Sequence, residues 1–239
     1  MSDVARTAAD APVPAVKRKR KPLTFWQEMP LLVGLAIVFA LLLKTFAFQA
    51  FVIPSGSMES TIMTHDRVMT NKLVYDVRDP HRGEVVVFAR TGNWPDESGA
   101  SKPPNAVGKA LQFIGLLPSG TDFIKRVVGL PGDTITCCDA QDHMLINGKP
   151  LDETAYTQGS NTTSSRTLGF TGSVVVPAGQ LFVMGDNREN SLDSRKYGTI
   201  PIDSVVGRAV VVMWPRSHWK GLRVPGAVEQ FTSTQSGAG

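Results

Sequence analysis

An uncharged apolar run over residues 29–43 constrains this chain more than any other feature of its sequence. Lys44 interrupts the run, and a largely apolar stretch then continues to Ile53. A membrane-spanning helix needs about 20 apolar residues, within a range of about 17–25. A lysine near the end of a span can extend its amine to the interface, where aromatic side chains are also favoured. We therefore predict a transmembrane anchor over residues 29–50.

The alternative for this segment is a removable signal peptide cut after Ala50, because a basic region, an apolar core and a small residue occur in that order. Cleavage there would release residues 51–239 from the membrane, and the uncleaved anchor is the favoured interpretation.

Positive charge is concentrated before the apolar run. Residues 1–29 hold six basic and three acidic side chains, which accounts for most of the formal net charge of +4. Short basic flanks remain on the cytoplasmic side of a membrane and are attracted to its anionic surface. We expect residues 1–28 to be a disordered cytoplasmic tail and residues 51–226 to form an extracytoplasmic (periplasmic) domain. The high pI then reflects topology and contact with the lipid bilayer, and nucleic acid is not an expected partner.

Short β-branched segments separated by turn residues follow the anchor, and none of the sequence predicts a long amphipathic helix. The clearest segments are 68–72, 82–88, 122–129, 134–137, 144–149, 174–177, 180–184 and 205–214. Asn147-Gly148 is a strong signal for a hairpin turn. The predicted class is mostly β, an antiparallel sheet domain with long loops after one N-terminal transmembrane helix.

Three stretches fall outside this pattern. Residues 91–121 and 152–172 are expected to be surface excursions, and residues 227–239 a disordered, frayed tail. Within the first excursion, Val107, Ala110, Leu111 and Ile114 would share one face of a short helix. That face either packs on the β core, which we favour, or forms a second membrane contact.

Ser57 is the candidate nucleophile, and it needs a base because an isolated serine is a poor nucleophile. The four histidines, His65, His81, His143 and His218, lie in sequence contexts typical of surface or turn positions. Lys125 is the better candidate, because alternation along a strand would give it Phe123 and Val127 as neighbours on its own face. Burial favours the neutral amine and lowers the pKa of a lysine. From the spacing alone, Lys125 could equally be an ordinary exposed lysine with no catalytic role. No histidine or cysteine spacing suggests a metal site.

Four blocks in order make the chain resemble the bacterial type I signal peptidases, the membrane-bound Ser/Lys leader peptidases. The blocks are Pro54-Ser55-Gly56-Ser57-Met58, residues 82–88, residues 125–133 and residues 185–195. The resemblance covers most of the chain after residue 30. It implies an acyl-enzyme mechanism with Ser57 as nucleophile and Lys125 as general base, without a metal or organic cofactor.

The same resemblance implies roles for further residues. Ser55 would donate to the oxyanion together with the backbone N–H of Ser57, and Ser191 would orient Lys125. Supporting charged roles are implied for Asp186, Arg188, Asp193 and Arg195. From the residues alone, the last block could equally be a polar turn with surface ion pairs.

The chain departs from the family in one place, because the usual Pro-Thr-Leu after Ser-Met and one further residue is here Ser60-Thr61-Ile62. The missing proline is expected to loosen the turn without affecting Ser57 or Lys125. Cys137 and Cys138 are adjacent, and neighbouring Cα atoms about 3.8 Å apart are below the usual disulfide range of about 4.4–6.8 Å. Two separate thiols, or a labile bond, are therefore favoured over a structural disulfide.

The implied function is a signal peptidase I, a membrane-bound serine endopeptidase that removes N-terminal signal peptides from exported preproteins. Its partners would be preproteins and the bilayer, and no obligate protein partner is evident. One rival is a self-cleaving Ser/Lys repressor, for which residues 1–28 are too short to supply a DNA-binding module. A second rival is a membrane-anchored β scaffold in which Ser57 and Lys125 are inert.

Overall fold

The computed structural model describes residues 25–95, 105, 122–141, 143–157 and 170–236. Residues 1–40 and 41–239 form two separate units, and the site lies in the second. Helix α1 runs over Phe25–Phe46. None of the helices in the described part of the chain meets the length and hydropathy required to cross a membrane.

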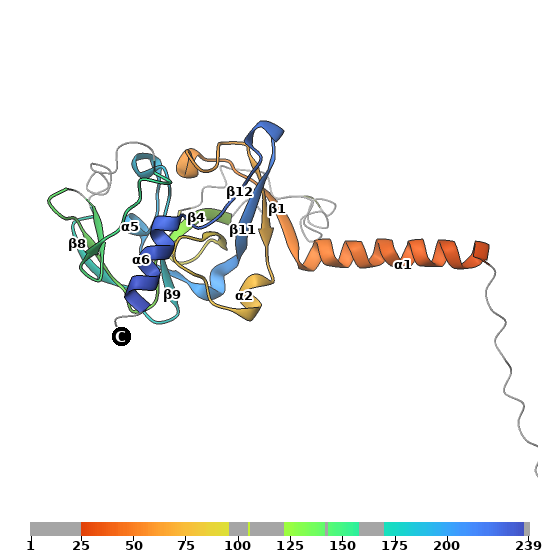
Figure 1. Ribbon diagram of the computed structural model, residues 1–239, viewed down its shortest axis with the longest axis horizontal. Coiled ribbons are helices and arrows are strands. Elements are labelled where there is room, and N and C mark those ends of the chain that lie inside the picture. Colours follow the sequence, from red (N-terminus) through yellow and green to blue (C-terminus); the bar gives the residue numbers. More distant parts are fainter. Residues whose placement is uncertain (1–24, 96–104, 106–121, 142, 158–169, 237–239) are drawn as a thin grey trace, which may run out of the picture. The chain divides into compact units, whose positions relative to one another are not determined.

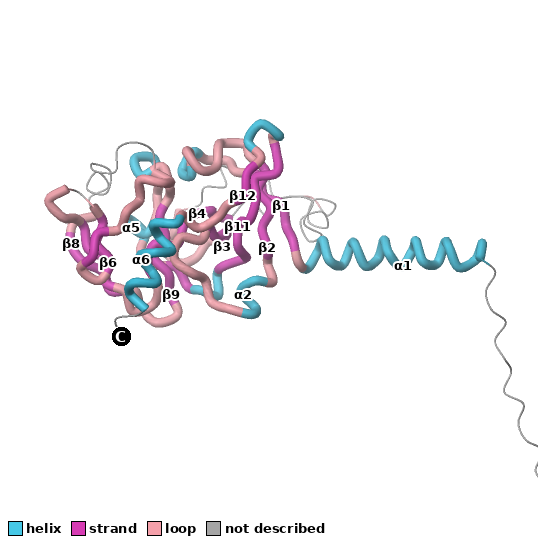
Figure 2. The backbone as a smooth tube through the Cα atoms, viewed as in Figure 1, coloured by secondary structure: helices cyan, strands magenta, loops and turns pink. Residues whose placement is uncertain are grey.

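The larger of the two sheets in the second unit is antiparallel and has eight strands (Figures 1 and 2). Its strands follow one another in the order β1-β2-β11-β3-β4-β9-β10, and β12 pairs with β11. Their bounds are β1 Phe48–Val52, β2 Arg67–Asn71, β3 Val85–Ala89, β4 Asp122–Gly129, β9 Gln180–Met184, β10 Ile200–Pro201, β11 Val205–Trp214 and β12 Lys220–Gly221. The late strand β11 therefore lies between two early strands, β2 and β3.

A second, four-stranded sheet lies at the opposite end of this unit from β1 (Figure 1). Its order is β7-β6-β5-β8, with bounds β5 Thr134–Cys137, β6 Met144–Ile146, β7 Lys149–Pro150 and β8 Gly172–Val175. Asn147 and Gly148 connect β6 to β7 with φ of 53° and 78°, as a hairpin turn of this kind requires. The predicted antiparallel, mostly β class is confirmed, and so is the predicted hairpin.

Short helices and 3₁₀ turns complete the domain. They are η1 Gly56–Met58, α2 Val74–Val77, η2 Arg188–Asn190, α5 Ser194–Tyr197, η3 Ile202–Ser204, η4 Arg216–His218 and α6 Gly226–Ser236. Successive side chains of β4 point to opposite faces of the sheet, as strand geometry predicts. Phe123 and Val127 pack into one apolar cluster, and Ile124 packs into another. Lys125 therefore enters the interior from the middle of a strand with apolar neighbours.

The predicted anchor over residues 29–50 is divided between two elements. Helix α1 ends at Phe46, and strand β1 begins at Phe48 and pairs with β2. Phe51 is buried, whereas Phe48 and Val52 are exposed, which is the alternation of a strand. A short apolar run cannot be assigned to helix or strand from its periodicity alone, and this one continues the sheet.

The chain end and the two cysteines also differ from expectation. Residues 226–236 form helix α6 instead of a frayed tail, because Val228 is buried and Phe231 packs on the same apolar cluster. Cys137 and Cys138 are joined by a disulfide, so the expectation of two separate thiols is wrong, and the other favoured possibility, a labile bond, stays a prediction. Their Cα atoms are 3.1 Å apart, so a separation below the usual disulfide range did not exclude the bond.

Candidate active site

Ser57 and Lys125 lie side by side although 67 residues separate them in the sequence. Ser57 is in the 3₁₀ turn η1, between β1 and β2, and Lys125 is in the middle of β4. The Nζ atom of Lys125 is 2.7 Å from Oγ of Ser57, and both side chains are buried, with exposed fractions of 1% and 4%. An amine and a hydroxyl at this distance can exchange a proton directly.

Local contacts hold the turn that carries Ser57. Ser55 is extended, and the backbone N–H of Glu59 donates to the carbonyl oxygen of Gly56 at 3.1 Å. Met58 and Ile62 are fully buried and join the apolar cluster beneath the turn. The hydroxyl of Ser55 donates to Oγ of Ser57 at 3.3 Å, so the two hydroxyl groups lie next to each other.

The turn after Ser57 is held by hydrogen bonds despite the missing proline. Ser60 has a φ of 86°, and its hydroxyl donates to the carbonyl oxygen of Tyr156 at 2.6 Å. The N–H groups of Thr61 and Ile62 both donate to the carbonyl oxygen of Met58. The hydroxyl of Ser60 thus bonds this segment to a distant loop, and the expected loosening of the turn stays a prediction.

Four charged residues of the last block, Asp186, Arg188, Asp193 and Arg195, are buried. Asp186 makes a two-pronged ion pair with Arg126, the residue after Lys125, with N···O distances of 2.8 and 2.6 Å. Asp193 pairs with Arg195, both side chains having no exposed surface. Burial alone would raise the pKa of Asp193, but hydrogen bonds from Arg195, its positive charge, and contacts with Gly185 N–H and Ser191 lower it. The ion pairs of Asp186 and Asp193 therefore lie in the interior and not at the surface.

Ser191 and Gly185 approach the nucleophile closely. Ser191 is buried, and within the described residues its Oγ has no hydrogen-bond partner of standard geometry. A Cβ atom added to Gly185 would overlap Ser191 and the carbonyl oxygen of Ser57, so this position has room only for glycine. The expected bond from Ser191 to Lys125 stays a prediction.

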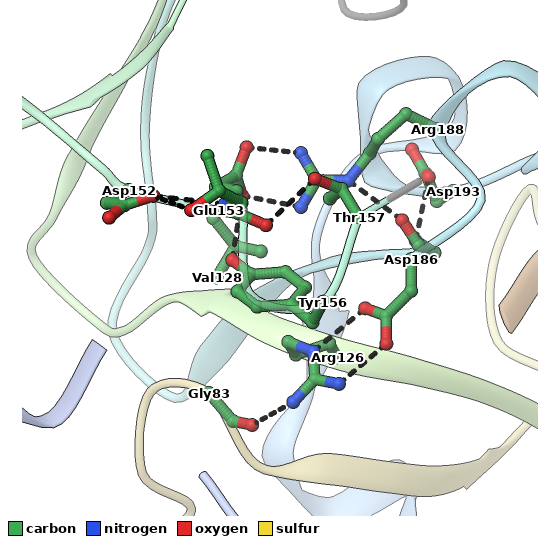
Figure 3. Close-up of polar contacts among 12 residues, drawn as sticks. Gly83, Arg126, Val128, Asp152, Glu153, Tyr156, Thr157, Asp186, Arg188 and Asp193 are labelled. Carbon is green, nitrogen blue, oxygen red and sulfur yellow. Dashed lines mark hydrogen bonds and ion pairs between the residues drawn. The ribbon is translucent and has the colours of Figure 1, made fainter. Parts of the chain in front are cut away.

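A second buried pair lies beside the first (Figure 3). Arg188 binds the carboxylate of Glu153 with both terminal nitrogens, and its Nε donates to the carbonyl oxygen of Gly185 at 2.8 Å. The ring of Tyr156 lies 4.4 Å from the guanidinium carbon of Arg126, and its hydroxyl donates to Glu153 at 2.9 Å. Burial, reinforced by the negative charge of Glu153, raises the pKa of Tyr156, so the phenol remains a donor.

These contacts correct the expectation that residues 152–172 form a surface excursion. Glu153, Tyr156 and Thr157 are all buried against the block that supports Ser57, while residues 158–169 lie outside the described residues. In the other predicted excursion Trp94 is buried. The proposed apolar helix face at residues 107–114 also lies outside the described residues.

Sequence reasoning did not assign a role to Arg126, Glu153, Tyr156 or Asn187. The only signal was adjacency for two of them: Arg126 follows Lys125, and Asn187 stands between Asp186 and Arg188. Nothing in the sequence near Glu153 or Tyr156 indicates a contact 35 residues ahead. Of the histidines, His218 pairs with the buried Asp66, which is consistent with its expected turn position. Within the described ranges, no three His, Cys, Asp or Glu side chains gather as metal ligands.

The model of the family described as "Signal peptidase, peptidase S26" matches residues 26–214. The chain belongs to this family. It is 34% identical to "Probable signal peptidase I" of Mycobacterium leprae, over 92% of this chain and 86% of that protein. It is 37% identical to "Probable signal peptidase I-2" of Synechocystis, over 83% and 78% of the two chains.

Among solved structures, a signal peptidase I from Enterococcus faecalis is 27% identical, with a TM-score of 0.35. The match covers 55% of this chain and 97% of that one. Membership of the family makes this chain a serine endopeptidase of the signal peptidase I type.

Proposed function

We propose that this chain cleaves N-terminal signal peptides from exported preproteins with Ser57 as the nucleophile and Lys125 as the general base. The observation that carries the assignment is the 2.7 Å separation of the buried amine and the hydroxyl. Burial disfavours a charged ammonium, and a neutral amine can accept the proton of Ser57. The family to which the chain belongs supports the substrate class.

In the proposed reaction, Oγ of Ser57 attacks the scissile carbonyl carbon while Nζ of Lys125 takes its proton. The tetrahedral intermediate collapses when the bond to the leaving amine breaks and Lys125 returns the proton to that amine. Lys125 then deprotonates a water molecule that attacks the carbonyl carbon of the acyl-enzyme. The bond from this carbon to Oγ of Ser57 breaks, and Lys125 returns the proton to Oγ. The backbone N–H of Ser57 and the hydroxyl of Ser55 would stabilise the oxyanion in both steps.

The buried charged residues would hold this arrangement. The ion pair between Arg126 and Asp186 would join β4, the strand that carries Lys125, to the last block. The ion pair between Asp193 and Arg195 would hold the segment around Ser191. Ser191 would orient the amine of Lys125. Resemblance to the family adds a preference for small residues, often alanine, at the first and third positions before the cut.

The proposed topology is a single membrane pass with a cytoplasmic N-terminus and the catalytic domain outside. It rests on the basic run at residues 17–21 and the uncharged run at residues 29–43. Leu31, Leu35 and Phe39 on α1 are each more than half exposed, as side chains in contact with lipid would be. This orientation predicts that the domain is protected from added protease in sealed inside-out membrane vesicles. Protection should be lost after detergent opens the vesicles.

The function is tested by incubating the purified chain with a preprotein and sequencing the new N-terminus. Ser57→Ala and Lys125→Ala should each abolish cleavage, and the double variant should be little worse than either alone because the two act as a unit. Ser233→Ala and Lys149→Ala are matched controls, since both residues are exposed and remote in the sequence from Ser57 and Lys125. Substantial cleavage by the Lys125 variant would refute the lysine base, and cleavage by the Ser57 variant would favour an inert scaffold.

A further inference from the structure

One residue, Asn187, binds both backbone carbonyls that flank the nucleophile. Its side-chain Nδ2 donates to the carbonyl oxygen of Gly56 at 3.0 Å, and its backbone N–H donates to the carbonyl oxygen of Ser57 at 3.1 Å. Asn187 is 131 residues from Gly56 in the chain. It therefore joins the nucleophile turn η1 to the distant turn η2.

The carbonyl of Gly56 and the N–H of Ser57 belong to one planar peptide group. This peptide is trans, so its N–H points away from its C=O and cannot rotate independently of it. A hydrogen bond that fixes the oxygen of Gly56 consequently fixes the direction of the Ser57 N–H. Under the proposed function, that N–H is a donor to the oxyanion.

The Gly56 oxygen also accepts the N–H of Glu59 at 3.1 Å, so two donors act on it. Donation to a carbonyl oxygen polarises its peptide group and strengthens the N–H as a donor. The amide of Asn187 would thus both aim the Ser57 N–H and make it a better donor.

The side chain of Asn187 has no role in its own turn. Asn187 occupies the N-cap position of η2, where asparagine commonly accepts a backbone N–H, yet its side chain makes no capping bond. Its side-chain amide instead donates to the carbonyl oxygen of Gly56, in the turn that carries the nucleophile.

We propose that Asn187 is a positioning residue that orients the oxyanion-binding N–H of Ser57. The inference rests on the proposed function, in which Ser57 is the nucleophile. It predicts that Asn187 matters more for the transition state than for the bound substrate.

The test compares Asn187→Ala and Asn187→Asp with Asn190→Ala. Asn187→Asp keeps the size of the side chain but turns the donor into an acceptor facing the Gly56 oxygen. Asn190 is the matched control, because it is the same residue type in the same turn and its side chain is exposed. Both Asn187 variants retain the backbone N–H that binds Ser57, and thermal melts report whether each is folded.

Three quantities are measured: kcat and KM for an alanine-containing signal-peptide substrate, and the affinity of a peptide boronate that forms a tetrahedral adduct on Ser57. Loss of one oxyanion donor costs about 10²–10³ in rate, so misdirecting it should lower kcat by about 10- to 100-fold with KM little changed. Boronate affinity should fall by a similar factor, and Asn187→Asp should be worse than Asn187→Ala. Asn190→Ala should match the wild type.

Wild-type kcat in both Asn187 variants would overturn the inference. A fall in kcat that tracks the loss of folded protein, with boronate affinity unchanged in the folded fraction, would also overturn it and leave Asn187 a purely structural role. Ser57→Ala is run in parallel: if it is inactive while the Asn187 variants are fully active, only the inference fails. If Ser57→Ala still cleaves, the proposed function itself fails.

Discussion

Gly185→Ala is expected to damage both the stability and the activity of the domain. The added Cβ would lie 2.6 Å from Cβ of Ser191 and closer still to Oγ of Ser191 and to the carbonyl oxygen of Ser57. Carbon atoms in contact are normally about 3.5–4.0 Å apart, so the overlap is about 1 Å. The hydroxyl of Ser191 can rotate away, but the oxygen of Ser57 belongs to the backbone and can move only with the nucleophile turn.

Overpacking of this kind costs about 1–3 kcal/mol, and a clash with backbone places Gly185→Ala at the upper end. For a domain of this size, about 3 kcal/mol corresponds to a fall in Tm of about 6–12 °C. A displacement of Ser57 by about 1 Å should also cost about 10²-fold in activity. Thermal melts and cleavage of a short alanine-containing peptide measure the two effects.

The control is Gly221→Ala, because no atom lies within 4 Å of the Cβ that it would introduce. Neither glycine has a positive φ, so the two substitutions differ in space and not in backbone freedom. A Gly185→Ala variant with the Tm and kcat/KM of the wild type would refute the close approach of this residue to the nucleophile turn.

Three further predictions follow from buried or strained positions. Ser60→Pro should lower stability by more than about 1 kcal/mol in urea unfolding, because proline requires a φ near −65° and the bond to Tyr156 is lost, whereas Ser60→Gly should lose only that bond. Asp193→Asn should cost about 3–5 kcal/mol by leaving Arg195 buried without its carboxylate. Because the folded-state pKa of Asp193 is lowered, its stabilising effect is complete above the unfolded value of about 3.9 and is lost as the pH falls through the folded value; the variant should therefore show a weaker loss of stability in acid than the wild type. Val228→Ala should lower the unfolding free energy by about 2 kcal/mol if α6 is packed, and an unchanged unfolding curve would indicate a frayed end.

The strands could be predicted from the sequence because their signals are local. The segments at residues 122–129, 134–137, 180–184 and 205–214 have the bounds that the structure gives to β4, β5, β9 and β11. Each combines β-branched residues with flanking turn residues, and the Asn147-Gly148 hairpin depends only on backbone preferences. Residues 48–50, the first part of β1, fall in the predicted anchor because burial in a sheet and burial in lipid select the same side chains.

The support of the site could not be predicted in the same way. The contacts of Glu153 with Arg188, Ser60 with Tyr156, and Asn187 with Gly56 join segments 35, 96 and 131 residues apart. Neither partner in such a pair carries a local signal for the other, because polar residues of these types are also common in exposed turns. The resemblance to a family indicated that the last block supports the site, and the structure shows which groups the block contacts.

The position of β11 between β2 and β3 imposes an order of events on the enzyme. Strands β1 and β2 flank the turn that carries Ser57, and Lys125 lies on β4, which pairs with β3, so the strand that joins the two parts of the sheet is synthesised after both residues. A growing chain has translated both residues of the pair well before it reaches Trp214, yet it has no continuous sheet on which to bring them together. We therefore expect that a chain ending before β11 would lack a continuous sheet between the strands that flank Ser57 and the strand that carries Lys125.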